Sequence, residues 1–288
     1  MASALVPAHR VRIINRERTA SFCECIYCGM KATQGKLTDE HVIPFALDAN
    51  AVIEKASCES CAAITARLEQ VLARQILAQY RAHIGEQTRR PGERPTKFKF
   101  QASVNGGPLA EFEAPVSEAP YFTYMPIFNP PGIFIGAQPM REFEVSEVHR
   151  YEWVPNTLRA IVGANAGDNV QIANTQLPFR FDLFARALAK IAYCQAIASY
   201  GLDGFRRLVT AKLILGHYPY VPYFVGSSLE LPPPAGPAAA KHSVVLQYTN
   251  IHRLNLFTAT IRLYANSGTD EVGMPFYDVV IGAPPFTR

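Results

Sequence analysis

Four of the six cysteines fall into two Cys-x-x-Cys pairs, Cys25–Cys28 and Cys58–Cys61. Cysteine thiolates are ligands that zinc prefers, and a turn of this spacing presents two of them to one tetrahedral ion. Two such pairs separated by tens of residues are the usual arrangement of a four-cysteine structural zinc site. Gly29 directly follows the first pair and suits this turn, because glycine adopts positive φ at little cost. The sequence therefore predicts one zinc ion that both pairs bind and that compensates for the small hydrophobic core of so short a segment.

The other two cysteines are expected to lie outside this site. Cys23 forms a Cys-x-Cys with Cys25 and is an alternative start for the first turn, but the spacing that matches the second pair favours Cys25. Cys194 lies within KIAYCQAIASY, which has an apolar helical pattern. We expect a buried thiol there, because a free cysteine in such a pattern behaves as a small apolar side chain.

Between the two pairs stands Asp39-Glu40-His41-Val42-Ile43-Pro44. An acid followed by His-x-x-Pro, placed between two Cys-x-x-Cys pairs with the second pair opening a helix, resembles the HNH endonuclease family. The resemblance covers about residues 20–85. It implies a small zinc-stabilised ββα-metal module in this part of the chain. It also implies a metal-dependent endonuclease that hydrolyses phosphodiester bonds in nucleic acid, with DNA as the expected substrate.

The resemblance also assigns two catalytic roles. His41 would be the general base, because a neutral imidazole with a pKa of ~6.5 accepts a proton from water at neutral pH. Glu40 would bind Mg²⁺ or another divalent cation, a hard ion that prefers carboxylate oxygen. Such a cation offsets the charge that develops on the phosphate in the transition state.

The sequence departs from the family pattern at the remaining ligands. A His or Asn commonly follows the last cysteine in the family, and here that residue is Ala62, which cannot coordinate a metal. Thr65 and Glu69, further along the same expected helix, are the substitute ligands for the divalent cation. Asn50 is the nearest match to the middle Asn of the family. The departures leave an alternative open, a catalytically silent zinc-stabilised module that binds nucleic acid.

The segment after the second pair has the pattern of one amphipathic helix that ends at Gly85. Arg67, Arg74 and Arg81 recur every seven residues on its polar side, where they are either solvated or bind phosphates. Residues 65–99 contain eight basic and three acidic residues, an excess of +5 against +4 for the whole chain. This concentration of charge favours phosphate binding. The expected nucleic-acid-binding residues are Arg67, Arg74, Arg81, Arg89 and Arg90.

We expect an α+β fold in two parts, with the zinc module at 1–88, a linker at 89–97 rich in Pro and Gly, and an α+β accessory domain at 98–288. In the second part, Asn105-Gly106 predicts a β-hairpin. Further strands are expected at 130–137, 141–154, 242–250, 253–266 and 274–284, and helices at 179–200 and 202–216.

The chain has 288 residues, of which 49% are hydrophobic and 18% are charged. This composition forms a core and excludes a chain that is disordered throughout. Neither a bilayer-spanning apolar run nor a signal peptide is expected, so the sequence predicts a soluble cytoplasmic protein without a membrane partner. The net charge of +4 is too small to name a partner by itself.

Overall fold

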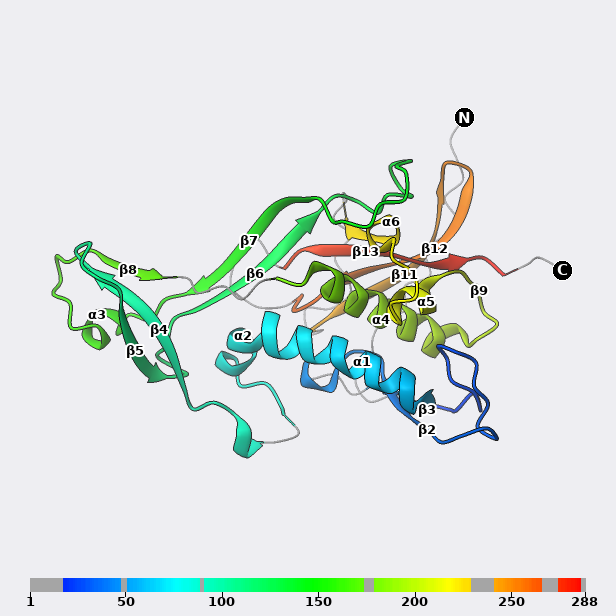
Figure 1. Cartoon of the computed structure of the whole chain (residues 1–288), viewed down its shortest axis with the longest axis horizontal. Helices are drawn as coiled ribbons and strands as arrows, with labels where there is room; N and C mark the ends of the chain where they lie inside the picture. Colours follow the sequence, from blue (N-terminus) through cyan, green and yellow to red (C-terminus); the bar gives the residue numbers. More distant parts are fainter. Residues whose placement is uncertain are drawn as a thin grey trace.

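The computed structural model describes residues 18–47, 51–88, 91–173, 179–228, 241–265 and 274–285. The fold is a mixture of helices and mostly antiparallel sheets, so the α+β class is confirmed. Its centre is the long helix α4 (Phe181–Tyr200), which packs against α1 (Glu59–Val71) and against a C-terminal sheet (Figure 1). Gly201, with φ +71°, ends α4 at the predicted place.

The N-terminal part is a three-stranded sheet followed by α1. Its strands are β1 (Arg18–Thr19), β2 (Leu37–His41) and β3 (Val52–Cys58), in the order β1-β3-β2, with β2 antiparallel to β3. A short 3-10 helix, η1 (Phe45–Leu47), follows β2. The register of β2 and β3 shifts between Thr38 and Glu40, and Glu40 is buried. Two antiparallel strands and a helix therefore occur where the sequence predicts them.

The single helix expected up to Gly85 is interrupted. After α1 comes a π-helical turn, η2 (Leu72–Ile76), and then α2 (Ala78–His83). The backbone N–H of Leu77 donates to the carbonyl of Leu72 at 3.0 Å, five residues earlier. On a regular α-helix these two residues would lie ~140° apart. The wider turn allows both leucines to be completely buried.

The C-terminal part contains an antiparallel sheet in the order β10-β13-β12-β11, with β9 also paired to β13. The three predicted C-terminal strands are confirmed, whereas the expected helix at 202–216 is reduced to the five residues of α5. Among the described residues, no helix is long and apolar enough to cross a membrane. The elements are β9 (Arg206–Arg207), α5 (Thr210–Ile214), α6 (Val221–Phe224), β10 (Val225–Ser227), β11 (Ser243–Ile251), β12 (Leu254–Arg262) and β13 (Phe276–Ala283).

A lobe formed by residues 97–119 and 158–173 projects from this body on a two-stranded ribbon formed by residues 121–128 and 145–153 (Figure 1). The predicted hairpin is present, and both Asn105 and Gly106 have positive φ. The strand expected at 130–137 is instead a series of turns, which suits a segment that begins with two prolines lacking an N–H. The elements are η3 (Pro91–Glu93), β4 (Lys97–Val104), β5 (Ala110–Pro115), β6 (Tyr121–Phe128), β7 (Val145–Trp153), α3 (Leu158–Ile161) and β8 (Val170–Ala173).

The hydrophobic core does not follow the predicted division at 88/98. One cluster of buried side chains joins residues 25–80 to residues 121–281, and a smaller cluster fills the lobe around Phe100 and Leu158. The physical reason is that α1 buries its apolar face against α4 instead of closing a core of its own. The N-terminal part is therefore continuous with the body of the protein, and the separate unit is the lobe.

Candidate metal centre

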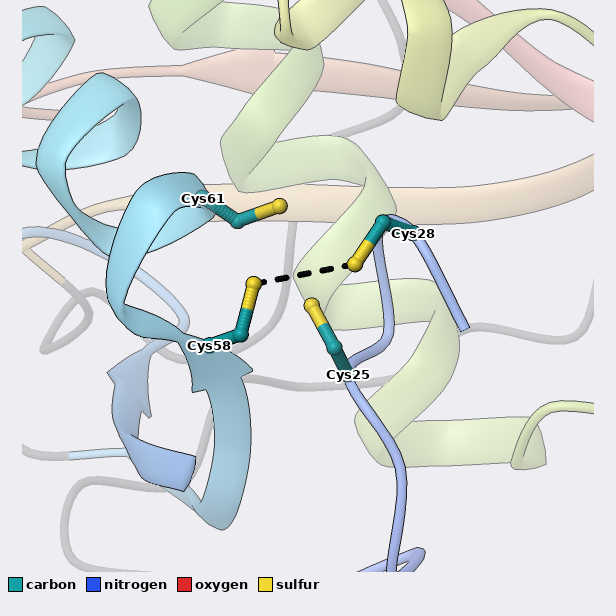
Figure 2. Close-up of side chains that lie close together, drawn as sticks. All are labelled: Cys25, Cys28, Cys58 and Cys61. Carbon is teal, nitrogen blue, oxygen red and sulfur yellow. Dashed lines mark hydrogen bonds between the residues drawn. The ribbon is translucent and has the colours of Figure 1, made fainter. Parts of the chain in front are cut away.

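The two Cys-x-x-Cys pairs meet at one point (Figure 2). The Sγ atoms of Cys25, Cys28, Cys58 and Cys61 all lie within 4.8 Å of one another, and those of Cys28 and Cys58 are 3.6 Å apart. Around a tetrahedral zinc ion with Zn–S bonds of ~2.3 Å, neighbouring sulfurs lie about 3.8 Å apart. The four cysteines thus form a cluster that fits a metal ion such as zinc, as the sequence predicts.

Backbone hydrogen bonds set the geometry of both turns. In the first turn, the Gly29 N–H donates to Cys25 O at 2.9 Å and the Cys25 N–H donates to Met30 O at 2.8 Å, with Gly29 at φ +78°. The second pair spans the junction of β3 and α1, where Cys58 is the N-cap residue. The Ile26 N–H donates to Ala56 O at 2.8 Å and so ties the first turn to β3.

The thiols differ in how readily they ionise. Burial raises the pKa of Cys58, but hydrogen bonds from the Ser60 hydroxyl, the Cys61 N–H and neighbouring thiols outweigh it and lower this pKa to about 6. Burial raises the pKa values of Cys28 and Cys61. Cys58 therefore ionises more readily than Cys28 and Cys61, and a metal ion that binds all four thiolates must displace the protons of the others.

The two other cysteines lie where the sequence predicts them. Cys23 is exposed and lies outside the four-cysteine cluster. Cys194 is completely buried in α4, and its Sγ lies 3.2 Å from the Tyr27 hydroxyl. Burial is the main reason that the pKa of Cys194 is raised to about 12, so the thiol stays protonated at neutral pH.

The residues proposed to bind a second, catalytic cation also come together. Glu40 of β2 is buried, and the Thr65 hydroxyl of α1 donates to its Oε2 at 3.4 Å. Glu69, one turn further along α1, reaches the same place. Between the two carboxylates lies the ammonium of Lys190 from α4, with Nζ 2.9 Å from Glu40 Oε1 and 2.7 Å from Glu69 Oε1.

Lys190 fills the position where the sequence predicts a divalent ion. Its side chain is 1% exposed, and Nζ also donates to the backbone carbonyl of His41. Burial lowers the pKa of Lys190, but attraction to Glu40 and Glu69 outweighs burial and raises it above the usual value. The pKa of Glu40 is raised by burial, although Lys190 opposes this shift. A divalent cation at Glu40 would have to share the two carboxylates with this ammonium, which their attraction keeps protonated.

His41, the expected general base, is half-buried at the end of β2. Its ring centroid lies 5.9 Å from that of Phe45. Glu40 precedes His41 on the strand and is buried. Because adjacent residues of a strand point to opposite faces, the side chains of Glu40 and His41 point away from each other. Ala62 on α1 offers no ligand atom, and Asn50 lies outside the described residues.

No protein-family model matches the chain, nor does any curated protein or solved structure.

The expected row of exposed arginines is only partly present. Arg67 and Arg74 are exposed, and within the described ranges neither guanidinium has an ion-pair partner. Arg89 and Arg90 lie outside the described residues. Acidic residues from outside this segment offset part of its positive charge of +5. Glu113 and Glu111 of β5 form ion pairs with Lys97 and Lys99 at 3.3 and 2.7 Å, respectively.

Arg81 was expected on the polar side of the helix and among the nucleic-acid-binding residues, but the structure turns its side chain inward. Its side chain is only 13% exposed. Nε donates to Ala46 O at 2.5 Å and Nη1 donates to Ala73 O at 2.9 Å, while Glu86 lies 3.4 Å away. The π-helical turn between Arg74 and Arg81 changes their relative direction, so a spacing of seven residues no longer keeps them on one face.

Replacing Arg81 with Gln is therefore expected to destabilise the fold by about 2 kcal/mol, because it removes charge-assisted hydrogen bonds to two carbonyls and a buried carboxylate. Urea unfolding monitored by circular dichroism measures this change. Arg74→Gln, a matched substitution of an exposed arginine, is expected to leave the unfolding midpoint where it is. Equal midpoints for both variants would show that Arg81 has no structural role.

Two features of this region were not predicted. The first is the role of Lys190. A lysine inside an apolar helical pattern is a signal of such a role, since lysine is almost never fully buried without a partner. The second is a cleft of about 670 Å³ between the α1–α2 segment and residues 93–98. Phe45 and Glu69 line it, so it adjoins the Lys190 cluster.

Proposed function

We propose that this protein binds nucleic acid through a zinc-stabilised module and does not cleave it. The observation that carries the proposal is the buried ammonium of Lys190 between Glu40 and Glu69. Hydrolysis of the HNH type needs a divalent cation at Glu40, and Lys190 already neutralises that carboxylate. At 1% exposure, Lys190 is also too buried to contact a phosphate itself.

The cysteine cluster supports a structural role for zinc. Four thiolates complete the tetrahedral coordination of the ion, whereas a catalytic zinc site keeps one position open for water or substrate. The cluster lies where β3 enters α1, and three of its cysteines belong to the main hydrophobic core. Zinc would therefore hold the sheet, α1 and the core together.

Three arginines support the proposal that the protein binds nucleic acid. Arg67 and Arg74 project from α1 and the turn that follows it, and Arg94 follows η3. Among the described residues, none of these three guanidinium groups has an ion pair. Unpaired arginines are groups that neutralise backbone phosphates and release counterions.

The test combines binding and cleavage. We expect the protein to bind DNA or RNA at low salt, with an affinity that falls as salt rises, and to leave supercoiled plasmid intact in Mg²⁺ or Mn²⁺. His41→Ala is expected to bind like the wild type, since a general base acts only in the transition state. Nicking by the wild type that disappears in His41→Ala would instead establish the endonuclease. An absence of binding at low salt would contradict the binding role.

A further inference from the structure

The cleft beside the Lys190 cluster has the dimensions and lining of a ligand site. Its volume of about 670 Å³ lies within the ~300–1,000 Å³ of typical ligand pockets. One wall is the α1–α2 segment, and the other is the chain from Glu93 to Phe98 that leads into β4. Residues 93–97 of the second wall belong to the segment predicted to be a linker.

Two positively charged side chains of the cleft are available to a ligand. Arg74 and Arg94 line the cleft, and within the part of the chain that the structure describes neither guanidinium has an ion pair. Two of the three carboxylates that line the cleft are engaged within the protein. Glu69 binds Lys190, and Glu86 binds Arg81 and Lys241.

Apart from Gln70 and Thr88, the rest of the lining is apolar and suits flat rings. Phe45 and Phe98 are half-buried at the cleft, and the α1–α2 wall presents alanines between its charged residues. A small side chain leaves room for a ring to lie against the helix. Aromatic side chains beside arginines are the combination with which proteins hold successive bases and phosphates of a single strand.

The position of Arg74 in the wall of a cleft favours a single strand over a duplex. A helix reads duplex DNA by entering a major groove about 12 Å wide, so the helix surface must protrude. Here the surface that carries Arg74 is one wall of a cleft, and residues 93–98 form the opposite wall. A strand whose bases are unpaired can bring both phosphate and base to these residues.

We propose that this cleft binds a single-stranded segment of nucleic acid, with phosphates on Arg74 and Arg94 and a base against Phe98. The proposal rests on the nucleic-acid-binding function above and specifies its ligand. The Lys190 cluster lies at one end of the cleft and fixes the position of the α1 wall through Glu69.

The experiment measures fluorescence anisotropy of a short labelled oligodeoxythymidine, with the zinc-loaded full chain. A duplex of equal length and free adenosine monophosphate serve as competitors. We expect the duplex to bind at least about tenfold more weakly than the single strand. Arg74→Gln and Arg94→Gln should each reduce the slope of log affinity against log salt by about 0.7, the value for one phosphate on a single strand. Phe98→Ala should weaken binding about tenfold through loss of stacking.

Control variants separate the cleft from the general surface charge. Lys212→Gln, an exposed lysine of α5 outside the cleft, should leave affinity and slope unchanged. Thermal unfolding of each variant verifies that it folds. Wild-type binding that survives Arg74→Gln and Arg94→Gln together, or that is as tight for the duplex, overturns the cleft proposal and leaves the proposed function standing. Tight binding of adenosine monophosphate alone shows a mononucleotide site and overturns the single-strand proposal. A wild type that binds neither nucleic acid defeats both proposals.

Discussion

Cys58→Ser is expected to unfold most of the protein, not only its N-terminal segment. Structural zinc contributes about 10 kcal/mol or more to small modules at neutral pH. That is comparable to the ~5–15 kcal/mol that stabilises a whole domain. Cys25, Cys58 and Cys61 belong to the same hydrophobic cluster as α4 and the C-terminal sheet, so loss of the metal would propagate through that core. Circular dichroism of the purified variant and elemental analysis for zinc give the result.

Cys23→Ser is the matched control, because this exposed cysteine lies two residues before Cys25 and outside the cluster. It should retain about one zinc per chain and the thermal midpoint of the wild type. A strong chelator should lower the midpoint of the wild type, and more so at acidic pH, where protons compete with the metal for the thiolates. A wild type that contains no metal, with Cys58→Ser equally stable, would falsify the zinc assignment.

The cysteine cluster was predictable from the sequence because its geometry is local. Each Cys-x-x-Cys turn places its own two thiols, and Gly29 marks the turn that needs positive φ. The surroundings of Glu40 were not predictable in the same way, because Lys190 lies 149 residues after His41 in the chain. Only the packing of α4 on α1 brings the ammonium between the two carboxylates. Residue spacing carries no information about such a contact.

The failure at Arg81 has a different physical cause. A heptad count assumes a uniform helix, and the π-helical turn at Leu72–Ile76 adds a residue to one turn. Burial of Leu77 favours that turn, and Arg81 then reaches the Ala73 carbonyl. The main hydrophobic cluster continues across the predicted linker for a related reason. Pro and Gly at residues 91 and 92 do mark an irregular segment, but composition does not reveal which core the flanking elements share.

Lys190→Met is expected to destabilise the protein by about 3–5 kcal/mol, the usual cost of leaving one side of a buried ion pair without its partner. Lys190 has a raised pKa in the folded protein. Its contribution to stability is therefore complete below the unfolded pKa of ~10.4 and is lost only as the pH rises through the higher folded value. At neutral pH its contribution is therefore complete, and its removal has its full cost. Equilibrium unfolding in urea measures the loss.

The pH dependence distinguishes an electrostatic loss from a packing defect. Burial already raises the pKa of Glu40, and removing Lys190 takes away the group that opposes this shift. The variant carboxyl therefore binds its proton more tightly when folded than when unfolded, and stability falls as the pH rises above the unfolded pKa of ~4.3. The deficit of Lys190→Met should be larger at about pH 8 than at about pH 5. A packing defect would give the same deficit at both.

A second substitution tests whether Glu40 is the group left unpaired. Glu40→Gln combined with Lys190→Met removes the carboxylate together with its ammonium, and such paired replacements are often close to neutral. The double variant should therefore recover much of the stability lost in Lys190→Met. Lys212→Met, at an exposed position of α5, controls for the general effect of replacing a lysine. Strictly additive losses from Glu40→Gln and Lys190→Met would show that the two side chains do not interact. Lys190 would then no longer explain why a divalent cation is excluded from Glu40.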